Sequence, residues 1–411
     1  MRKNLSKVLA TLLTVVLVSV LFIACGNNDP DYVTIEWWTP NWNEDASREM
    51  ADEFMAENPD VKVELVITDW ETYRASVTTA ISTDNAPEIF TILLTDVKPL
   101  ADLGFLQPLN DFDVLDPILA DIIPAALAIG TIDGDIYAIP HRYDGSGIFY
   151  NVDILSEAGF DTFPVTWDEM MAMAEVLAED GRPAFAWPLG NQAEAVTRFI
   201  QQLYSYDGSI LNADETESVL DGPAARQALG NIVNSIQAGI ASPNSLELNN
   251  TMMRNMFGTG QIAFNFTGPF DIDTLLEEYP DLNFRTAVIP GDGGMGVTTA
   301  NGWCIAMGAN SNNQEAAARF LAYINLPENQ VRLTDSFPGS STAIEFDDFA
   351  TEHLRPFAEQ LTNSRVEPIY SRWAEIEPII FNYIQQAVAG TISVDEAITN
   401  MSNDINTLLG S

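Results

Sequence analysis

The chain has 411 residues, of which 59 are Asp or Glu and 18 are Lys or Arg, giving a formal net charge of −41. So negative a chain excludes nucleic acid as a partner, because few cations are available to neutralise phosphates. It also disfavours anionic ligands, whereas a cationic ligand stays open. The acids are scattered along the chain, which predicts a solvated acidic surface.

The first 24 residues have the pattern of a secretory signal. Three cations lie in the first seven residues, an apolar stretch runs from Val8 to Ile23, and Ala24 precedes Cys25. The apolar stretch is shorter than the roughly 20 residues of a spanning helix, so a transmembrane anchor is the weaker alternative. A Cys at the cut resembles the lipidated Cys of bacterial lipoproteins. We predict a signal over residues 1–24, lipidation at Cys25, a polar linker over 25–32 and an extracytoplasmic location.

From residue 33 the sequence alternates between strand-like and helix-like segments. Strands are predicted at 33–38, 61–67 and 88–94, the last being a continuous apolar run typical of a buried parallel strand. Helices are predicted between them at 44–60 and 71–83, and another from 97. This order predicts a parallel sheet with helical cover.

After about residue 130 the regular alternation of strand-like and helix-like segments ends. Asp133-Gly134 between two apolar runs predicts a hairpin turn. Further strands are predicted at 147–151, 261–266 and 302–308. Further helices are predicted at 166–179, 191–206, 222–238, 267–279, 312–325 and from 349 onward. The mature body of roughly 390 residues suggests two domains. Cys304 lies in an apolar strand-like run and is predicted to be buried and unreactive.

Few residues support an enzyme. His141 and His353 are the only histidines, so neither a Ser-His-Asp set nor a histidine metal site is plausible. The glycine-rich segment 291–296 does not fit a phosphate-binding loop, because no Lys follows it. We therefore predict no catalytic activity, no cofactor and no metal. Paired carboxylates are so abundant that composition alone keeps a glycoside hydrolase open.

Five segments, in this order, resemble the solute-binding proteins of bacterial ABC importers, in the maltose- and multiple-sugar-binding group. They are "IEWWTP" with "ADEFMAENPDVKVELV", "AISTDNAPEIFTILLTDVKPLADLGFLQPLNDF", "GDIYAIPHRYDGSGIFYNVDILSEAGFDTFPVTWDEMMAMAEVL", "MFGTGQIAFNFTGPFDI" and "ANSNNQEAAARFLAYINLPENQ". The resemblance implies a periplasmic-binding-protein-like α/β fold of two discontinuous lobes around a ligand cleft. Lobe 1 would take 33–143 and 298–345, and lobe 2 would take 147–295 and 350–411. Hinge crossings would fall near 141–147, 294–301 and 341–348.

Candidate ligand contacts follow from this fold, because open parallel sheets bind ligands beyond the carboxyl ends of their strands. The loop after the first strand offers Trp38, Asn41, Trp42 and Glu44. The other candidates are Tyr143 and Asp144 at the first crossing, with Trp187 and Trp303. The resemblance adds Asp96, which would accept sugar hydroxyls, Phe270, which would stack on a sugar ring, and Arg372 and Trp373, which would lie in the cleft.

The chemistry of these residues suits a sugar, since aromatic rings cover its apolar faces and polar side chains bind its hydroxyls. Of the three tryptophans at 37–42, we expect Trp37 in the core and Trp42 nearest the ligand, with Trp38 between. The resemblance implies a monomer that delivers its ligand to ABC permease subunits and contacts the membrane only through the lipid. A polyamine or other organic cation is the first alternative ligand. A surface adhesin or hydrolase is the second alternative.

Overall fold

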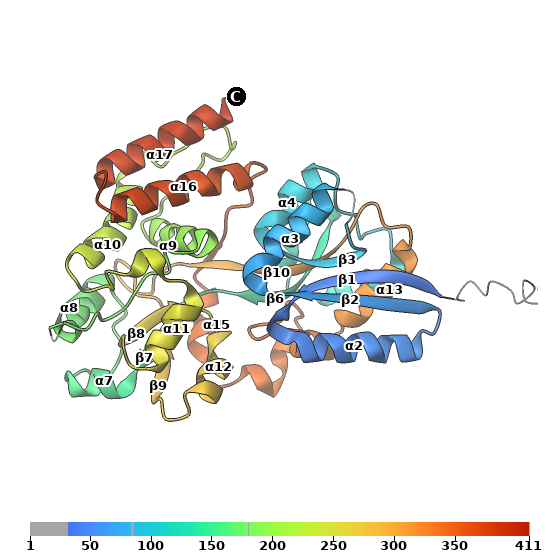
Figure 1. Ribbon diagram of the computed structural model, residues 1–411, viewed down its shortest axis with the longest axis horizontal. Helices are drawn as coiled ribbons and strands as arrows, with labels where there is room; N and C mark the ends of the chain where they lie inside the picture. The colour runs from blue at the N-terminus through green and yellow to red at the C-terminus, as the bar shows by residue number, and fades with distance from the viewer. Residues whose placement is uncertain (1–31, 84–85, 180, 411) are drawn as a thin grey trace, which may run out of the picture.

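The computed structural model describes residues 32–83, 86–179 and 181–410, which form two α/β lobes side by side (Figure 1). The predicted signal, Cys25 and nearly all of the linker lie outside these residues. Within the described part, no helix is long and apolar enough to span a bilayer.

Lobe 1 is built on a six-stranded sheet. Its strands are β1 (Val33–Pro40), β2 (Val61–Thr68), β3 (Ile89–Leu93), β6 (Ala138–Asp144), β10 (Thr298–Met307) and β11 (Ser364–Val366). The order is β11-β10-β3-β1-β2, with β6 also paired to β10. β1 runs parallel to β2 and β3, as predicted. The parallel arrangement predicted for the first three strands is thus confirmed, and β10 is antiparallel to β3 and β6, so the complete sheet is mixed.

Helices cover both faces of this sheet (Figure 1). They are α2 (Glu44–Glu57), α3 (Trp70–Ser82), α4 (Leu94–Asp102), α5 (Asp116–Asp121), α6 (Pro124–Leu127), α13 (Gln314–Ile324) and α14 (Pro327–Leu333), with the 3-10 turns η1 (Asn41–Asn43), η2 (Asp113–Leu115) and η3 (Ala128–Gly130). Trp37 packs edge-on against Phe320 of α13, and Phe54 of α2 contacts the same ring. The fully buried Trp37 confirms its predicted core position. Cys304 is likewise buried, as predicted.

The predicted hairpin is present as β4 (Thr131–Ile132) and β5 (Asp135–Ile136). Asp133 and Gly134 at its tip have φ of 54° and 98°. Positive φ at both central residues is what a tight two-residue hairpin turn needs, and Asp-Gly supplies it at low cost.

Lobe 2 has a three-stranded antiparallel sheet of order β8-β7-β9, with the strands β7 (Gly147–Asn151), β8 (Phe264–Thr267) and β9 (Phe284–Ala287). Its helices are α7 (Val152–Glu157), α8 (Trp167–Leu177), α9 (Gln192–Ser205), α10 (Pro223–Gln237), α11 (Asn250–Gly258), α12 (Asp271–Glu278), α15 (Arg355–Leu361), α16 (Trp373–Val388) and α17 (Val394–Leu409), with the 3-10 turns η4 (Ser245–Glu247), η5 (Ala343–Glu345) and η6 (Asp347–Phe349). The predicted strand 261–266 is displaced, since only its last three residues belong to β8. The short strands β9 and β11 were not predicted.

Each lobe is stabilised by a hydrophobic core of its own. One core runs through the helices of lobe 2, from Ile148 to Ile405 in the sequence. Another lies beneath the sheet of lobe 1, between Ile35 and Leu333. A smaller phenylalanine-rich cluster joins β7, β9 and α11 to the segment that follows α14 and to α15. The chain passes from the large sheet to the small one within two residues, Gly145 and Ser146.

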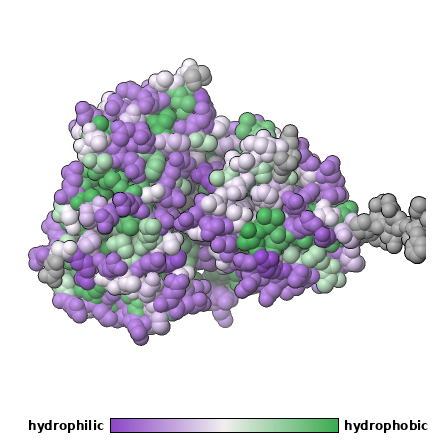
Figure 2. All heavy atoms as spheres, viewed as in Figure 1, coloured by the Kyte–Doolittle hydropathy of each residue, from purple (hydrophilic) through white to green (hydrophobic). Residues whose placement is uncertain are grey.

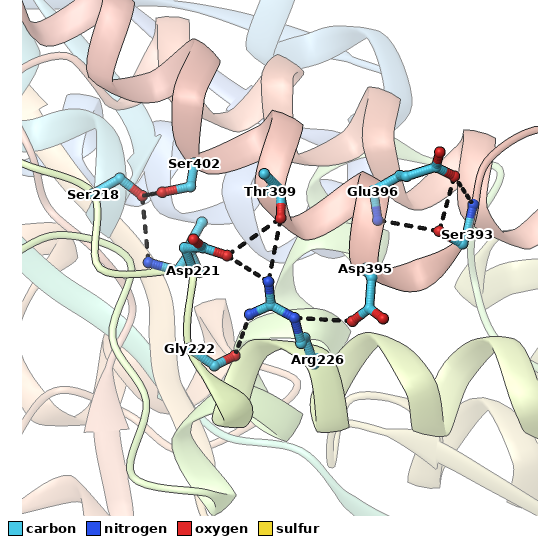
Figure 3. A network of polar contacts seen from close by, with 10 residues as sticks. Ser218, Asp221, Gly222, Arg226, Ser393, Asp395, Glu396, Thr399 and Ser402 are labelled. Atoms are coloured by element: carbon cyan, nitrogen blue, oxygen red, sulfur yellow. Dashed lines mark hydrogen bonds and ion pairs between the residues drawn. The ribbon is translucent and has the colours of Figure 1, made fainter.

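The outer helices of lobe 2 are tied together by Arg226 of α10 (Figure 3). Its guanidinium pairs with Asp221 before α10 and with Asp395 of α17, at 2.5 and 2.9 Å. It also donates to the Thr399 hydroxyl. Ser393 and Glu396 form a capping box that begins α17. Hydrophilic residues cover much of the face seen in Figure 2.

Candidate ligand-binding site between the lobes

Aromatic side chains of lobe 1 gather where β1 and β3 end. Trp42 follows β1, and Trp303 of β10 pairs in register with Leu93, the last residue of β3. The rings of Trp42 and Trp303 meet edge-on with centroids 4.8 Å apart. Tyr73 of α3 lies 6.3 Å from Trp303. Both predicted tryptophans are thus brought together at the carboxyl edge of the sheet, where open α/β sheets bind ligands.

Arg142 lies between this group and lobe 2, and it was not among the predicted ligand contacts. Its guanidinium carbon is 5.2 Å from the Trp42 ring centroid and 4.8 Å from that of Phe270. Trp42 belongs to lobe 1 and Phe270 to lobe 2, so one planar cation contacts an aromatic ring of each lobe. A guanidinium stacks well on such rings because it is planar and weakly hydrated.

Two carboxylates hold Arg142 in place. Its Nε donates to Asp144 Oδ2 at 2.9 Å, and its Nη1 pairs with Asp335 Oδ1 at 2.8 Å. Burial alone would lower the pKa of Arg142, but the charges of Asp335 and Asp144 raise it above its ordinary value. The pair with Asp144 is buried, with both side chains 7 % exposed. The alternation Arg142-Tyr143-Asp144 along a strand puts both charges on one face, which is the signal that could have identified Arg142.

A second charged group follows Phe270. Asp271 is buried, accepts from the Thr267 hydroxyl at 2.8 Å and pairs with Arg254 of α11 at 3.0 Å. Burial raises the pKa of Asp271, against the lowering effect of Arg254. Neither residue was among the predicted contacts.

Glu194, in the first turn of α9, is a third missed residue. Its Oε2 accepts from the backbone N–H of Asn250 at 2.8 Å. Burial raises the pKa of Glu194 to about 7, although Arg198 on the next turn acts to lower it. The caps Asn191 and Asn249 accept from the backbone N–H groups of Glu194 and Met252, which fixes the starts of α9 and α11.

Asp96 is engaged in an ion pair. Both its oxygens accept from Arg74 of α3, at 2.7 and 3.0 Å. Arg74 also reaches across to Glu377 of α16 at 3.3 Å, and Glu377 accepts from Gln192 at 3.0 Å. This chain of contacts joins lobe 1 to lobe 2. Asp96 was predicted to accept hydrogen bonds from sugar hydroxyls. In this structure its oxygens instead accept from Arg74 and hold that side chain in position.

The other candidates of lobe 1 have local partners. Asn41 Oδ1 accepts from the Trp70 backbone N–H, so it helps to begin α3. Glu44 pairs with Arg48 one turn along α2 and is exposed. Trp38 is half-buried, and its Nε1 donates to Glu36. Tyr143 is buried in the core of lobe 1, and its backbone N–H donates to the Phe337 carbonyl.

Three candidates of lobe 2 lie apart from this group. Trp187 is 1 % exposed, stacks on Phe266 and donates to Ser235, so it is a core residue. Trp373 is 3 % exposed within the same core. Arg372 pairs with Glu375 on α16 and donates to the Leu408 carbonyl. Trp187 and Trp373 fill space between helices, so their burial argues against direct ligand contact.

The crossings between the lobes are joined by a buried polar network. Arg198 donates to Ser146 Oγ at 2.6 Å and to the Phe266 carbonyl at 2.9 Å. The Ser146 N–H in turn donates to Thr298 Oγ1 at 2.8 Å. Burial lowers the pKa of Arg198 to about 10. The first and second crossings are therefore fixed to each other and to α9.

A separate open cavity of about 860 Å³ lies at the amino end of β1, away from the aromatic group. Tyr32, Asp60 and Arg319 line it, and an ion pair joins the last two at 2.7 Å. Among the described residues no cluster of His, Cys, Asp or Glu has an arrangement that could hold a metal ion.

Comparison with known proteins identifies the family. Residues 41–331 match the family model for bacterial extracellular solute-binding proteins. A binding protein of Brucella abortus (strain 2308) is 25 % identical over 366 residues, covering 87 % of this chain and 88 % of the relative.

Two solved structures share the fold. The GacH receptor of Streptomyces glaucescens, known unliganded and with acarbose, has a TM-score of 0.81 at 22 % identity, covering 92 % of this chain and 98 % of that one. Maltose-bound MalE3 of T. maritima has a TM-score of 0.82 at 21 % identity, covering 91 % and 99 %. The two-lobe fold predicted from the sequence is confirmed, and the chain belongs to the family of bacterial extracellular solute-binding proteins.

Proposed function

We propose that this protein is the sugar-binding lipoprotein of an ABC importer. It captures a sugar or oligosaccharide between its lobes and delivers it to the permease. The observation that carries the proposal is the junction itself, where Trp42 and Trp303 of lobe 1 and Phe270 of lobe 2 flank buried, hydrogen-bonding side chains. Aromatic faces beside convergent polar groups are the general pattern of sugar sites. The acarbose and maltose of the two structural relatives support the same ligand class.

The charges at the junction favour a neutral ligand over the organic cation. The buried or half-buried charged side chains there comprise four arginines and six acids: Arg74, Arg142, Arg198, Arg254, Asp96, Asp144, Glu194, Asp271, Asp335 and Glu377. Four positive charges against six negative ones give −2, and because the pKa of Glu194 is raised to about 7, this group carries a net charge between −2 and −1 at pH 7. The strong negative charge of the chain is therefore not concentrated at the site. A polyamine would need an excess of carboxylates facing it.

The remaining parts of the proposal follow the sequence. Cys25 carries the lipid, and the monomer is held at the outer face of the cell membrane by that anchor alone. We propose the division of the lobes at 33–143 with 298–345 and 147–295 with 350–411, with β11 of the last segment adding a strand to the lobe 1 sheet. The chain has no catalytic role, so an incubated sugar is recovered intact.

The proposal is tested by calorimetry on the purified protein against a panel of neutral mono- and oligosaccharides, including maltose, with spermidine as the cation. We expect a neutral sugar to bind and to raise the melting temperature by mass action. Its affinity should change little between low and high salt, whereas cation binding would weaken sharply. If only spermidine binds, the ligand is an organic cation and the sugar proposal is wrong. If the sugar is hydrolysed, the protein is an enzyme and not only a binding protein.

A further inference from the structure

Four side chains at the starts of two neighbouring helices share an unusual feature. Each has a buried polar atom without a hydrogen-bond partner in the described part of the chain: Glu194 Oε1, Arg198 Nε, Asn250 Oδ1 and Arg254 Nε. Glu194 and Arg198 are four residues apart on α9, and Asn250 and Arg254 are four apart on α11. Residues with this spacing share one face of a helix.

The two helix faces are joined to each other. The Asn250 N–H donates to Glu194 Oε2 at 2.8 Å, which brings the start of α11 against the first turn of α9. Arg254 pairs with Asp271 at 3.0 Å, and the charge of Asp271 also acts on Glu194. Glu194 is 9 % exposed and Arg198 3 % exposed. A buried polar group left without a partner destabilises the folded protein, because it has lost its hydrogen bonds to water.

Lobe 1 closes over this group from two sides. On one side Asn249 donates to Glu71 of α3 at 3.1 Å. On the other side Gln192 donates to Glu377, which pairs with Arg74 of α3. Since these contacts flank Glu194, the unpaired atoms lie near the junction of the lobes and not in the centre of lobe 2. The backbone N–H of Trp70, the first residue of α3, also donates to Oδ1 of Asn41, the neighbour of Trp42.

We propose that the starts of α9 and α11 form a polar subsite for a neutral sugar unit with adjacent hydroxyl groups, a proposal that rests on the proposed function. The unpaired atoms are two acceptors, on Glu194 and Asn250, and two donors, on Arg198 and Arg254. A hydroxyl both donates and accepts, so a pair of hydroxyls matches such a set. An anionic ligand would face Glu194 and Asp271. A cationic ligand would face the two arginines.

A purely structural polar network is the competing account, and Asn250 separates the two. Its side chain makes no hydrogen bond to any described residue, so its removal costs no bond within the protein. A structural account therefore predicts that Asn250→Ala leaves both stability and binding unchanged. The subsite predicts unchanged stability with weaker binding. Asn255→Ala, on the exposed side of the same helix, is the control for binding; it removes an exposed hydrogen bond from the Tyr279 hydroxyl at 3.3 Å.

The experiment measures the affinity of the full protein and both variants for the neutral sugars of the panel, with thermal melting in parallel. We expect Asn250→Ala to bind about 3- to 10-fold more weakly, the equivalent of one neutral hydrogen bond, and Asn255→Ala to match the parent. Glu194→Ala should weaken binding further. Should it fail to fold, Asn250→Ala still decides.

The outcomes separate the two levels of the proposal. If the parent binds a neutral sugar and Asn250→Ala binds it equally well, the subsite is wrong and the proposed function stands. If the parent binds no neutral sugar, the proposed function fails and the subsite with it. D-glucuronic acid and D-glucosamine test the class of ligand. Tighter binding of either than of D-glucose would overturn the neutral assignment.

Discussion

Trp37, Trp38 and Trp42 lie within six residues, yet each has a different environment. Trp37 is buried against Phe320, Trp38 is half-buried with its Nε1 bonded to Glu36, and Trp42 contacts Trp303 and Arg142 at the junction of the lobes. Alternation along β1 sends the first two to opposite faces of the sheet. Trp42 follows the strand, so its position depends on the loop rather than on the pleat.

This difference predicts opposite phenotypes for two substitutions. Trp42→Ala should weaken sugar binding at least 10-fold with little loss of stability, because the ring lies at the surface of the lobe core. Trp37→Ala should lower the free energy of unfolding by about 3–5 kcal/mol, the usual range for removing a buried aromatic ring. Denaturant unfolding and calorimetry on both variants check the pair. If Trp42→Ala loses stability but keeps its sugar affinity, Trp42 is a core residue and not a ligand contact.

Glu194 predicts a dependence of stability on pH. Burial raises the pKa of Glu194 to about 7 from its ordinary 4.5. The charged groups that act on it are Arg198 on its own helix, Asp271 on α12 and Glu71 on α3. A carboxyl with a raised pKa in the folded state is protonated there while already ionised in the unfolded chain. Its stabilising contribution is therefore complete below pH 4.5 and is lost as the pH rises to about 7.

The measurement compares the parent with Glu194→Gln, which cannot ionise. Between pH 4.5 and 7 the free energy of unfolding of the parent should fall relative to the variant, by on the order of 3 kcal/mol. The difference between the two curves removes the contributions of other titrating groups. Parallel curves for parent and variant would show that the pKa of Glu194 is not raised.

At the scale of elements, strands and helices could be read from the sequence because their hydrophobic spacing is local. The helices α2, α3, α8, α9, α10 and α13 all occur where the spacing predicts them. The short strands β9 and β11 could not be predicted, because three or four residues carry too little periodicity and the strands depend on partners far away in sequence. The junction residues Glu194 of α9 and Arg254 of α11 were missed for a related reason. Charged residues on helix faces look like solvated surface until the second lobe covers them.

The contact between α3 and α16 provides a test at this scale. Glu377 is 6 % exposed and joins Arg74 of lobe 1 to Gln192 of lobe 2. Glu377→Gln should weaken sugar binding by up to roughly 100-fold, because a hydrogen bond between charged groups across the junction contributes on the order of 1.5–3 kcal/mol. Asp60→Asn, which removes the exposed pair with Arg319 within lobe 1, is the control and should leave binding unchanged. If Glu377→Gln binds the sugar as tightly as Asp60→Asn does, the Arg74–Glu377 pair does not contribute to closure.

For the whole molecule, polar contacts join the lobes, beside the small phenylalanine-rich cluster that includes Phe149 and Phe337. Besides the Arg74–Glu377 pair, Asn249 donates to Glu71 and Ser371 donates to Asp102, at 3.1 and 2.6 Å. Arg142 adds stacking against both Trp42 and Phe270. Each lobe has its own hydrophobic core, whereas these cross-contacts are individually weak when exposed to water. The lobes can therefore separate without either core being opened, which is what a hinged binding protein requires.

A ligand that contacts both lobes binds the closed arrangement better and must shift the population toward it. We expect small-angle scattering to show a smaller radius of gyration with saturating sugar than without it. The shift should be reduced in Trp42→Ala, where one lobe loses its contact, even at sugar concentrations that saturate the variant. A ligand that binds tightly while the scattering curve stays unchanged would contradict closure. The site would then lie on one lobe alone, and the polar contacts between α3, α11 and α16 would be permanent features of a rigid molecule.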